Sequence, residues 1–221
     1  MNVRDWGDIE KAKILVIGHD PRLSSSDTIA EYCFFANYYF KEKLTSNSDK
    51  RKYALANNTF EQILYLTNNK YCVRDIFLTN LCNEELPHAP RNKTVLIPYE
   101  KARQGLSHIL KILEKGKIEY IFTLSLQVNY WLQKLNFYNA EKDFLEAAEP
   151  KQKGVDNSQP FYEPMRPKSF QLICGNVYNS QYGRYKVIPI LHSKNYPLTG
   201  NFLCYQIQYD RVRNYFYKLN S

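Results

Sequence analysis

The chain has 221 residues, of which 44% are hydrophobic and 24% are charged, as is ordinary for a soluble globular protein. No apolar run approaches a membrane span and the first residues lack the apolar stretch of a signal peptide, so we expect a cytoplasmic protein without membrane association. The 30 Lys and Arg residues against 22 Asp and Glu give a net charge of +8. The five cysteines form no CxxC pair, which argues against a zinc ribbon or a disulfide framework.

The basic residues are concentrated in two stretches. Leu86–Lys117 holds seven basic and two acidic residues, and Ser180–Ser221 holds six and one. Cations bind phosphates, and the 19 tyrosines and 12 phenylalanines offer flat partners for bases, so the composition suits a nucleic-acid surface. Basic proteins that bind no DNA are also common, and most of these aromatic residues must lie in the core.

Short apolar runs alternate with helical patterns along the chain. Buried strands are predicted at Ile14–Gly18, Val73–Thr79, Ile118–Leu124 and Tyr185–Leu191, with Phe170–Val177 as a candidate fifth. Helices are predicted at Thr28–Lys43, at Tyr53–Leu66 after a polar break at Asn47–Arg51, and at Tyr99–Glu114, Leu126–Leu135 and Phe202–Leu219. This order predicts an α/β fold, a three-layer α/β/α arrangement with a mainly parallel central sheet of about four strands.

We expect one domain over residues 1–221. The stretch 136–168 contains four prolines and a Lys-Gln-Lys-Gly turn, and we interpret it as an insertion in that domain. The chain contains neither GxGxxG nor GxxxxGK[ST], so dinucleotides and nucleoside triphosphates are not obvious ligands.

Polar residues that could take part in catalysis or binding follow three of the predicted strands. His19 and Asp20 follow the first, Asn80 ends the second and His192 follows the last. Singly, Asp20 could cap a helix, Asn80 form a turn and His192 be a structural histidine. Because the carboxyl ends of parallel strands meet at one edge, the joint pattern predicts a site there.

The residues at these strand ends resemble a known family. Ile17–Pro21, Ile-Gly-His-Asp-Pro, resembles the first motif of the uracil-DNA glycosylase superfamily. Leu78–Leu81, Leu-Thr-Asn-Leu, is similar to its asparagine-bearing motif, and Ile188–Ser193 is similar to its closing His-Pro-Ser motif. The similarity runs in the right order from about residue 11 to residue 200.

This resemblance implies a monomeric DNA glycosylase that flips uracil or a related damaged base out of single- or double-stranded DNA. It would hydrolyse the N-glycosidic bond without a metal or a cofactor. Catalysis would rest on Asp20, which activates water and offsets charge on the sugar, and on His192, which hydrogen-bonds the departing base. Phe34 would stack on the base, Asn80 would read its edge, and the base pocket would also include Gly18, His19 and Arg22. The loop that presses into the DNA would contain Ser193, Lys194, Pro197 and Leu198.

Three residues depart from the family pattern. His19 replaces a glutamine, and Ser193 replaces the proline of the closing motif. Arg22 stands where the best-known branch has a tyrosine that excludes thymine, which leaves the discrimination between uracil and thymine open. Two other functions remain as alternatives: an inactive superfamily member that binds nucleic acid or a modified nucleotide, and an unrelated α/β hydrolase of small nucleosides.

Overall fold

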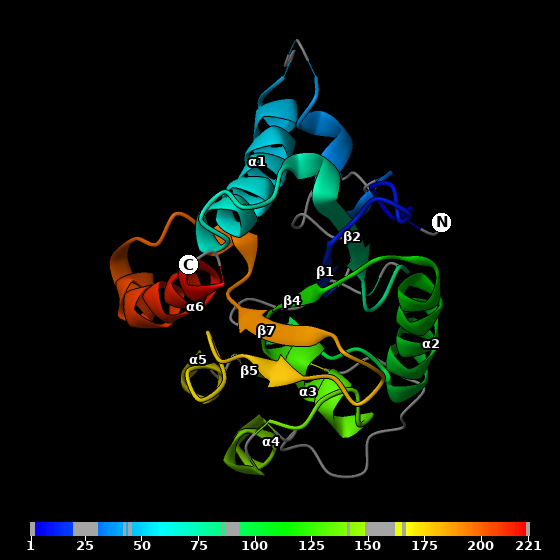
Figure 1. Ribbon diagram of the computed structural model, residues 1–221, viewed down its shortest axis with the longest axis vertical. Helices are drawn as coiled ribbons and strands as arrows, with labels where there is room; N and C mark the ends of the chain where they lie inside the picture. Colours follow the sequence, from blue (N-terminus) through cyan, green and yellow to red (C-terminus); the bar gives the residue numbers. More distant parts are fainter. Residues whose placement is uncertain are drawn as a thin grey trace.

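The protein has an α/β fold with a five-stranded, mostly parallel mixed sheet and, in the described residues, six α-helices (Figure 1). This computed structural model describes residues 3–19, 31–41, 43, 46–84, 86, 93–140, 142–148, 162–164 and 167–219. Within these ranges, no helix combines the length and the apolar character needed to cross a membrane.

The central sheet has the strand order β2-β1-β4-β7-β6. Its strands are β1 (Ile14–Gly18), β2 (Ile76–Asn80), β4 (Tyr120–Leu124), β6 (Tyr178–Asn179) and β7 (Lys186–Ile190). The first four in the spatial order are parallel, and β6 joins β7 antiparallel. Nearly every residue of the four parallel strands is buried, as expected for continuous apolar runs covered on both faces. The four predicted strands are therefore confirmed, except that the second begins only at Ile76, because Val73–Asp75 form the 3₁₀ helix η2.

The candidate fifth strand at Phe170–Val177 is wrong. Helix α5 (Pro167–Phe170) and a turn occupy most of that stretch, and the antiparallel strand begins only at Tyr178. Cys174 donates its backbone N–H to Phe170 O and Gly175 has φ +76°, so the chain turns here instead of extending.

Three long helices and a shorter one lie close to their predicted positions. These are α1 (Asn47–Leu66), α2 (Tyr99–Lys115), α3 (Leu126–Lys134) and α6 (Gln206–Lys218). Helix α1, in cyan, packs beside α6, in red, and α3 lies next to α4 (Lys142–Ala148) (Figure 1). The start of the predicted last helix is instead the 3₁₀ helix η4 (Gly200–Tyr205).

The predicted polar break at Asn47–Arg51 is wrong, because these residues form the first turns of α1. Ser46 caps the helix by accepting the backbone N–H of Asp49 at 3.1 Å. A serine cap followed by an acidic residue three positions later is typical of a helix start.

The predicted helix at Thr28–Lys43 is also wrong over its described part. Residues 28–30 lie outside the described ranges, and the 3₁₀ helix η1 (Cys33–Tyr38) follows. Phe34 and Phe35 have φ values of 56° and 54°, which no α-helix accommodates. Both rings are buried, so packing of the aromatic side chains overrides the helical pattern.

The expected insertion, 136–168, contains regular structure in its described part. Phe137 and Tyr138 are fully buried. The stretch also contains α4 and the strand β5 (Tyr162–Pro164), which pairs antiparallel with β3 (Lys93–Val95). The stretch thus packs on the sheet domain in its first residues and pairs with the segment after β2 further along.

Candidate functional site at the carboxyl edge of the sheet

The ends of β1 and β2 lie side by side at the carboxyl edge of the sheet. Gly18 and Asn80 are partners in the parallel ladder, and Leu81 donates its backbone N–H to Gly18 O at 2.8 Å. Strand β7 runs parallel to these two strands and ends two residues before His192. The fold therefore brings three of the predicted strand-end positions to the same edge, as the sequence analysis expected.

Gly18 lies in close contact with two predicted site residues. A Cβ atom built on Gly18 would lie 2.4 Å from Asn80 Oδ1 and 2.4 Å from Phe34 Cζ. Real Cβ atoms essentially never approach neighbours closer than 3.0 Å. Glycine is therefore needed at this position because the amide and the aromatic ring occupy the space that a side chain would fill.

The Phe34 ring extends from Gly18 toward His192. The centroids of the Phe34 and His192 rings are 6.3 Å apart, with an interplanar angle of 46°. Phe34 is 7% exposed and Asn80 is 2% exposed. The predicted stacking ring, base-reading amide and imidazole thus lie in one cluster, which we call the Gly18 cluster: Gly18, Phe34, Asn80 and His192.

The backbone after His192 defines the protonation of its ring. Lys194 donates its backbone N–H to His192 Nδ1 at 3.1 Å. A ring nitrogen that accepts a hydrogen bond carries no proton, so the imidazole is neutral in this arrangement and Nε2 carries the hydrogen. His192 is therefore arranged as an Nε2–H donor.

Helix α1 holds the loop that follows β7. Gln62 Nε2 donates to Leu191 O at 2.9 Å, and the hydroxyls of Thr59 and Ser193 are hydrogen-bonded to each other at 2.8 Å. Ser193 is fully buried, so its side chain anchors this loop and is not available for the predicted contact with DNA. Of the other residues predicted to contact DNA, Lys194 and Pro197 are exposed and Leu198 is half-buried against the core.

His19 turns toward the start of α3. Its Nε2 hydrogen-bonds Gln127 Oε1 at 2.8 Å, and the same oxygen accepts the backbone N–H of Ile97 at 3.2 Å. A carbonyl oxygen only accepts, so His19 Nε2 is the donor. Gln127 thereby joins the end of β1 to the segment before α2, a role that the sequence analysis missed.

Asp20 and Arg22, which were assigned to catalysis and to the base pocket, lie outside the described residues.

Ser125 is a second residue of this edge that the sequence analysis missed. It follows β4 directly and has φ 88° and ψ 160°, a strained conformation for a residue other than glycine. Its hydroxyl is buried and has no hydrogen-bond partner among the described residues. Strain and an unsatisfied polar group together are typical of functional sites, but no sequence pattern around Ser125 indicates either.

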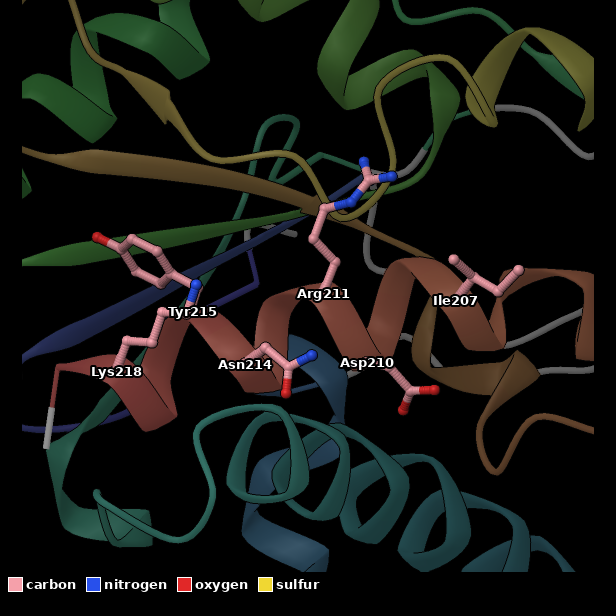
Figure 2. Close-up of a pocket in the computed structure, with 6 residues that line it drawn as sticks. All are labelled: Ile207, Asp210, Arg211, Asn214, Tyr215 and Lys218. Carbon is pink, nitrogen blue, oxygen red and sulfur yellow. The ribbon is translucent and has the colours of Figure 1, made fainter. Parts of the chain in front are cut away.

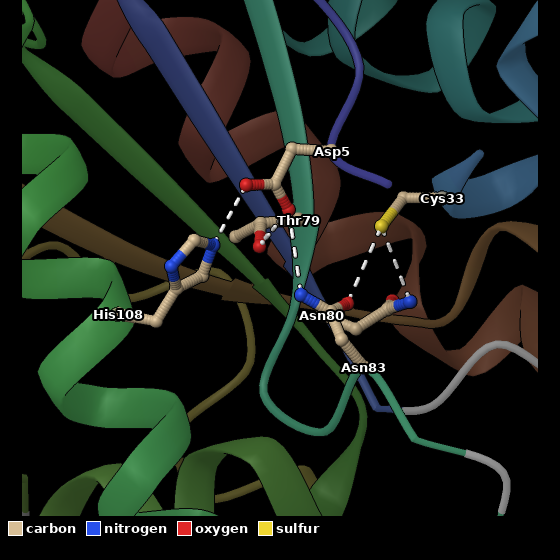
Figure 3. Close-up of polar contacts among 6 residues, drawn as sticks. All are labelled: Asp5, Cys33, Thr79, Asn80, Asn83 and His108. Carbon is tan, nitrogen blue, oxygen red and sulfur yellow. Dashed lines mark hydrogen bonds and ion pairs between the residues drawn. The ribbon is translucent and has the colours of Figure 1, made fainter. Parts of the chain in front are cut away.

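A polar cluster adjoins the outer side of Asn80. The Asp5 carboxylate accepts the Thr79 hydroxyl at 2.7 Å and lies 2.7 Å from His108 Nε2 (Figure 3). The hydrogen bond to Asp5 raises the pKa of His108 above its usual value, with partial burial opposing the shift. A cavity of about 440 Å³ lies here, and Asp5, Asn80, Lys101 and His108 are among its lining residues.

A separate hollow of about 560 Å³ lies on α6, away from the strand ends (Figure 2). Its lining residues are Ile207, Asp210, Arg211, Asn214, Tyr215 and Lys218. All of them belong to one helix, so within the described part of the chain this surface has no second wall to enclose a ligand. The Gly18 cluster, built from four separate segments, is the better candidate for a binding site.

No family model matches this sequence, and no curated protein matches it. The geometry of the site and the resemblance of its short motifs therefore carry the functional argument.

Proposed function

We propose that this protein is a DNA glycosylase that excises uracil or a related damaged base by hydrolysing the N-glycosidic bond of a flipped nucleotide. The observation that carries the proposal is that Phe34 and Asn80 meet at Gly18, while the His192 ring lies beside that of Phe34. A flat ring, an amide and an imidazole donor are the contacts that hold an extruded pyrimidine. We further propose that the α/β fold is the three-layer arrangement of the uracil-DNA glycosylase superfamily.

The arrangement of His192 suits the departure of a pyrimidine anion. Breaking a glycosidic bond places positive charge on the sugar and negative charge on the leaving base. An Nε2–H donor, held by the bond from Lys194 N to Nδ1, can stabilise the charge on the base without transferring its proton. Asp20, two residues after Gly18 in the chain, is assigned the opposite task of stabilising the sugar cation and activating water.

Phe34 and Asn80 suit recognition of the base itself. An aromatic ring stacks on any base, whereas an amide offers one acceptor and a donor group that match a specific edge. Uracil presents the O4 acceptor beside the N3–H donor, so a single asparagine can bind both. Lys194, which is exposed two residues after His192, supplies positive charge for the phosphate of the same nucleotide.

The test is base release from oligonucleotides that carry one uracil, in single and double strands, with strand cleavage at the resulting abasic site as readout. The wild type should release uracil, and Asp20→Asn should lower turnover by about 10²-fold or more while DNA binding survives. Asp8→Asn is the control, because Asp8 forms an exposed ion pair with Lys11 away from the site.

Failure to release uracil, hypoxanthine or any other deaminated base would refute the enzymatic proposal. Binding of the oligonucleotide without cleavage would then support an inactive superfamily member that binds nucleic acid or a modified nucleotide. Hydrolysis of free nucleosides but not of DNA would support an unrelated α/β hydrolase.

A further inference from the structure

The N-terminal segment places the carboxylate of Asp5 beside β2, the strand that ends at Asn80. Trp6 and Leu78 exchange backbone hydrogen bonds of 3.0 and 2.8 Å, which hold the segment against β2. Asp5 then lies next to the end of β2, where it accepts hydrogen bonds from Thr79 at 2.7 Å and from Asn83 Nδ2 at 3.5 Å. Figure 3 shows Asp5 with His108 on one side and, beyond the two asparagines, Cys33 on the other.

Asp5 is linked to Asn80 by a series of hydrogen bonds, and the carboxylate of Asp5 fixes which group donates and which accepts in each of them. An ionised carboxylate accepts but cannot donate, so Asn83 must turn its Nδ2 group to Asp5 and its Oδ1 away. That Oδ1 accepts the Cys33 thiol, with Sγ 3.6 Å away, and the sulfur in turn accepts Asn80 Nδ2 at 3.3 Å. We call this series the Asp5 chain: Asp5, Asn83, Cys33 and Asn80.

Cys33 can maintain this order of donors and acceptors, because its thiol both donates and accepts a hydrogen bond. Its side chain is fully buried, and burial together with the nearby charge of Asp5 raises the pKa of its thiol well above the usual range. The thiol therefore keeps its proton and donates to Asn83. Its sulfur is left as the acceptor toward Asn80.

The direction of the chain decides which groups Asn80 turns toward the site. One N–H of Asn80 is directed to Cys33, and Oδ1 is directed to Gly18, where a Cβ atom would lie 2.4 Å from it. Rotating the amide by 180° would exchange donor and acceptor at the same positions. Uracil presents an acceptor beside a donor and cytosine presents the reverse, so the two amide orientations favour different bases.

We propose that Asp5, acting through Asn83 and Cys33, is a positioning residue that holds the Asn80 amide in the orientation that accepts uracil and rejects cytosine. This step rests on the glycosylase function proposed above and assigns its base selectivity to residues that never touch the base. If the Asn80 amide were reversed, its NH₂ group would face the N3–H donor of uracil. A buried polar site strongly disfavours two donors that face each other.

The test compares kcat/KM for release of uracil and of cytosine from otherwise identical oligonucleotides. In Asp5→Asn, residue 5 can donate as well as accept, so the order of donors and acceptors in the Asp5 chain is no longer fixed. The preference for uracil should therefore fall by about tenfold or more. Cys33→Ala should have the same effect, whereas Cys33→Ser, whose hydroxyl also donates and accepts, should largely restore selectivity. The control is Glu84→Gln. Glu84 lines the same cavity as Asp5, but its ion pair with Lys101 involves none of the four residues of the Asp5 chain. Unchanged selectivity in both Asp5→Asn and Cys33→Ala overturns the proposal.

A second measurement distinguishes this proposal from the function on which it rests. In ¹H–¹⁵N spectra, the side-chain amide protons of Asn80, identified by their loss in Asn80→Asp, should exchange slowly in the wild type. Exchange should be faster by about tenfold or more in Cys33→Ala and Asp5→Asn and unchanged in Glu84→Gln. Equal exchange in all variants would show that the chain does not hold Asn80, even where uracil is released. A wild type that releases no base refutes the proposed function and the selectivity step with it, whereas slow exchange would still establish the Asp5 chain.

Discussion

Gly18→Ala tests whether Phe34 and Asn80 form one tightly packed cluster at the end of β1. The new methyl group would lie 2.4 Å from an atom of each side chain, so both must retreat by 0.6 Å to reach the 3.0 Å limit. The backbone cannot take up this shift easily, because Gly18 and Asn80 are paired in the ladder. Overpacking of this kind costs about 1–3 kcal/mol. In a protein of this size, that corresponds to a fall in Tm of about 2–12 °C.

The same displacement should impair catalysis, since a shift of about 1 Å in a positioned group can cost about 10²-fold in rate. We therefore expect kcat/KM for uracil release to fall by about tenfold or more in Gly18→Ala. Gly116→Ala is the matched control: its methyl group would meet the flexible end of Ile9 at 2.8 Å, at the end of α2. A Gly18→Ala variant that keeps both its Tm and its kcat/KM would show that Phe34 and Asn80 do not fill this space.

Three further predictions concern the surroundings of the site. Thr59→Val leaves the buried Ser193 hydroxyl without its Thr59 partner and should lower the free energy of unfolding by about 1–3 kcal/mol in urea titrations. The double variant with Ser193→Ala should lose less unfolding free energy than the sum of the losses in the two single variants. Because Asp5 raises the pKa of His108 in the folded protein, the protonated ring stabilises the fold below pH 6.5, and this stabilisation is lost as the pH rises through the raised pKa. His108→Gln should therefore lower the urea midpoint at about pH 6 and leave it unchanged at about pH 9. Lys194→Gln should reduce the slope of log affinity for DNA against log salt by about 1, and an unchanged slope would remove Lys194 from the phosphate contacts.

The parallel strands could be predicted because each is a short apolar run that ends at a polar residue. That pattern predicts both burial and strand direction, and strand direction alone brings Gly18, Asn80 and His192 to one edge. The short 3₁₀ turn at Phe34 could not be predicted in the same way. Its left-handed backbone depends on where the two phenylalanine rings find room in the core, which no local pattern encodes.

The residues around Asn80 could not be predicted, because they depend on contacts between distant parts of the chain. Asp5 lies 74 residues before Thr79, and Cys33 lies 47 residues before Asn80. A free cysteine is among the residue types most often buried and usually packs as a small apolar side chain, so nothing in the sequence around Cys33 marks it as a hydrogen-bonding group. Its role becomes visible only where Asn83 and Asn80 approach its sulfur from two sides.

The position of Asn80 in the sheet explains why it needs such support. Strands β1 and β7 each have a paired strand on both sides, whereas β2 is the outermost strand of the order β2-β1-β4-β7-β6. An edge strand is held on one side only, yet a group that reads a base must be held to within about 0.5 Å. The bridge between Trp6 and Leu78 pairs part of the open edge of β2, and Asp5 extends that pairing to the side chains at the end of the strand. The segment around Asp5 and Trp6 thus contacts both the edge strand and its last side chains, and in the proposed glycosylase base selectivity would depend on the attachment of this segment to β2.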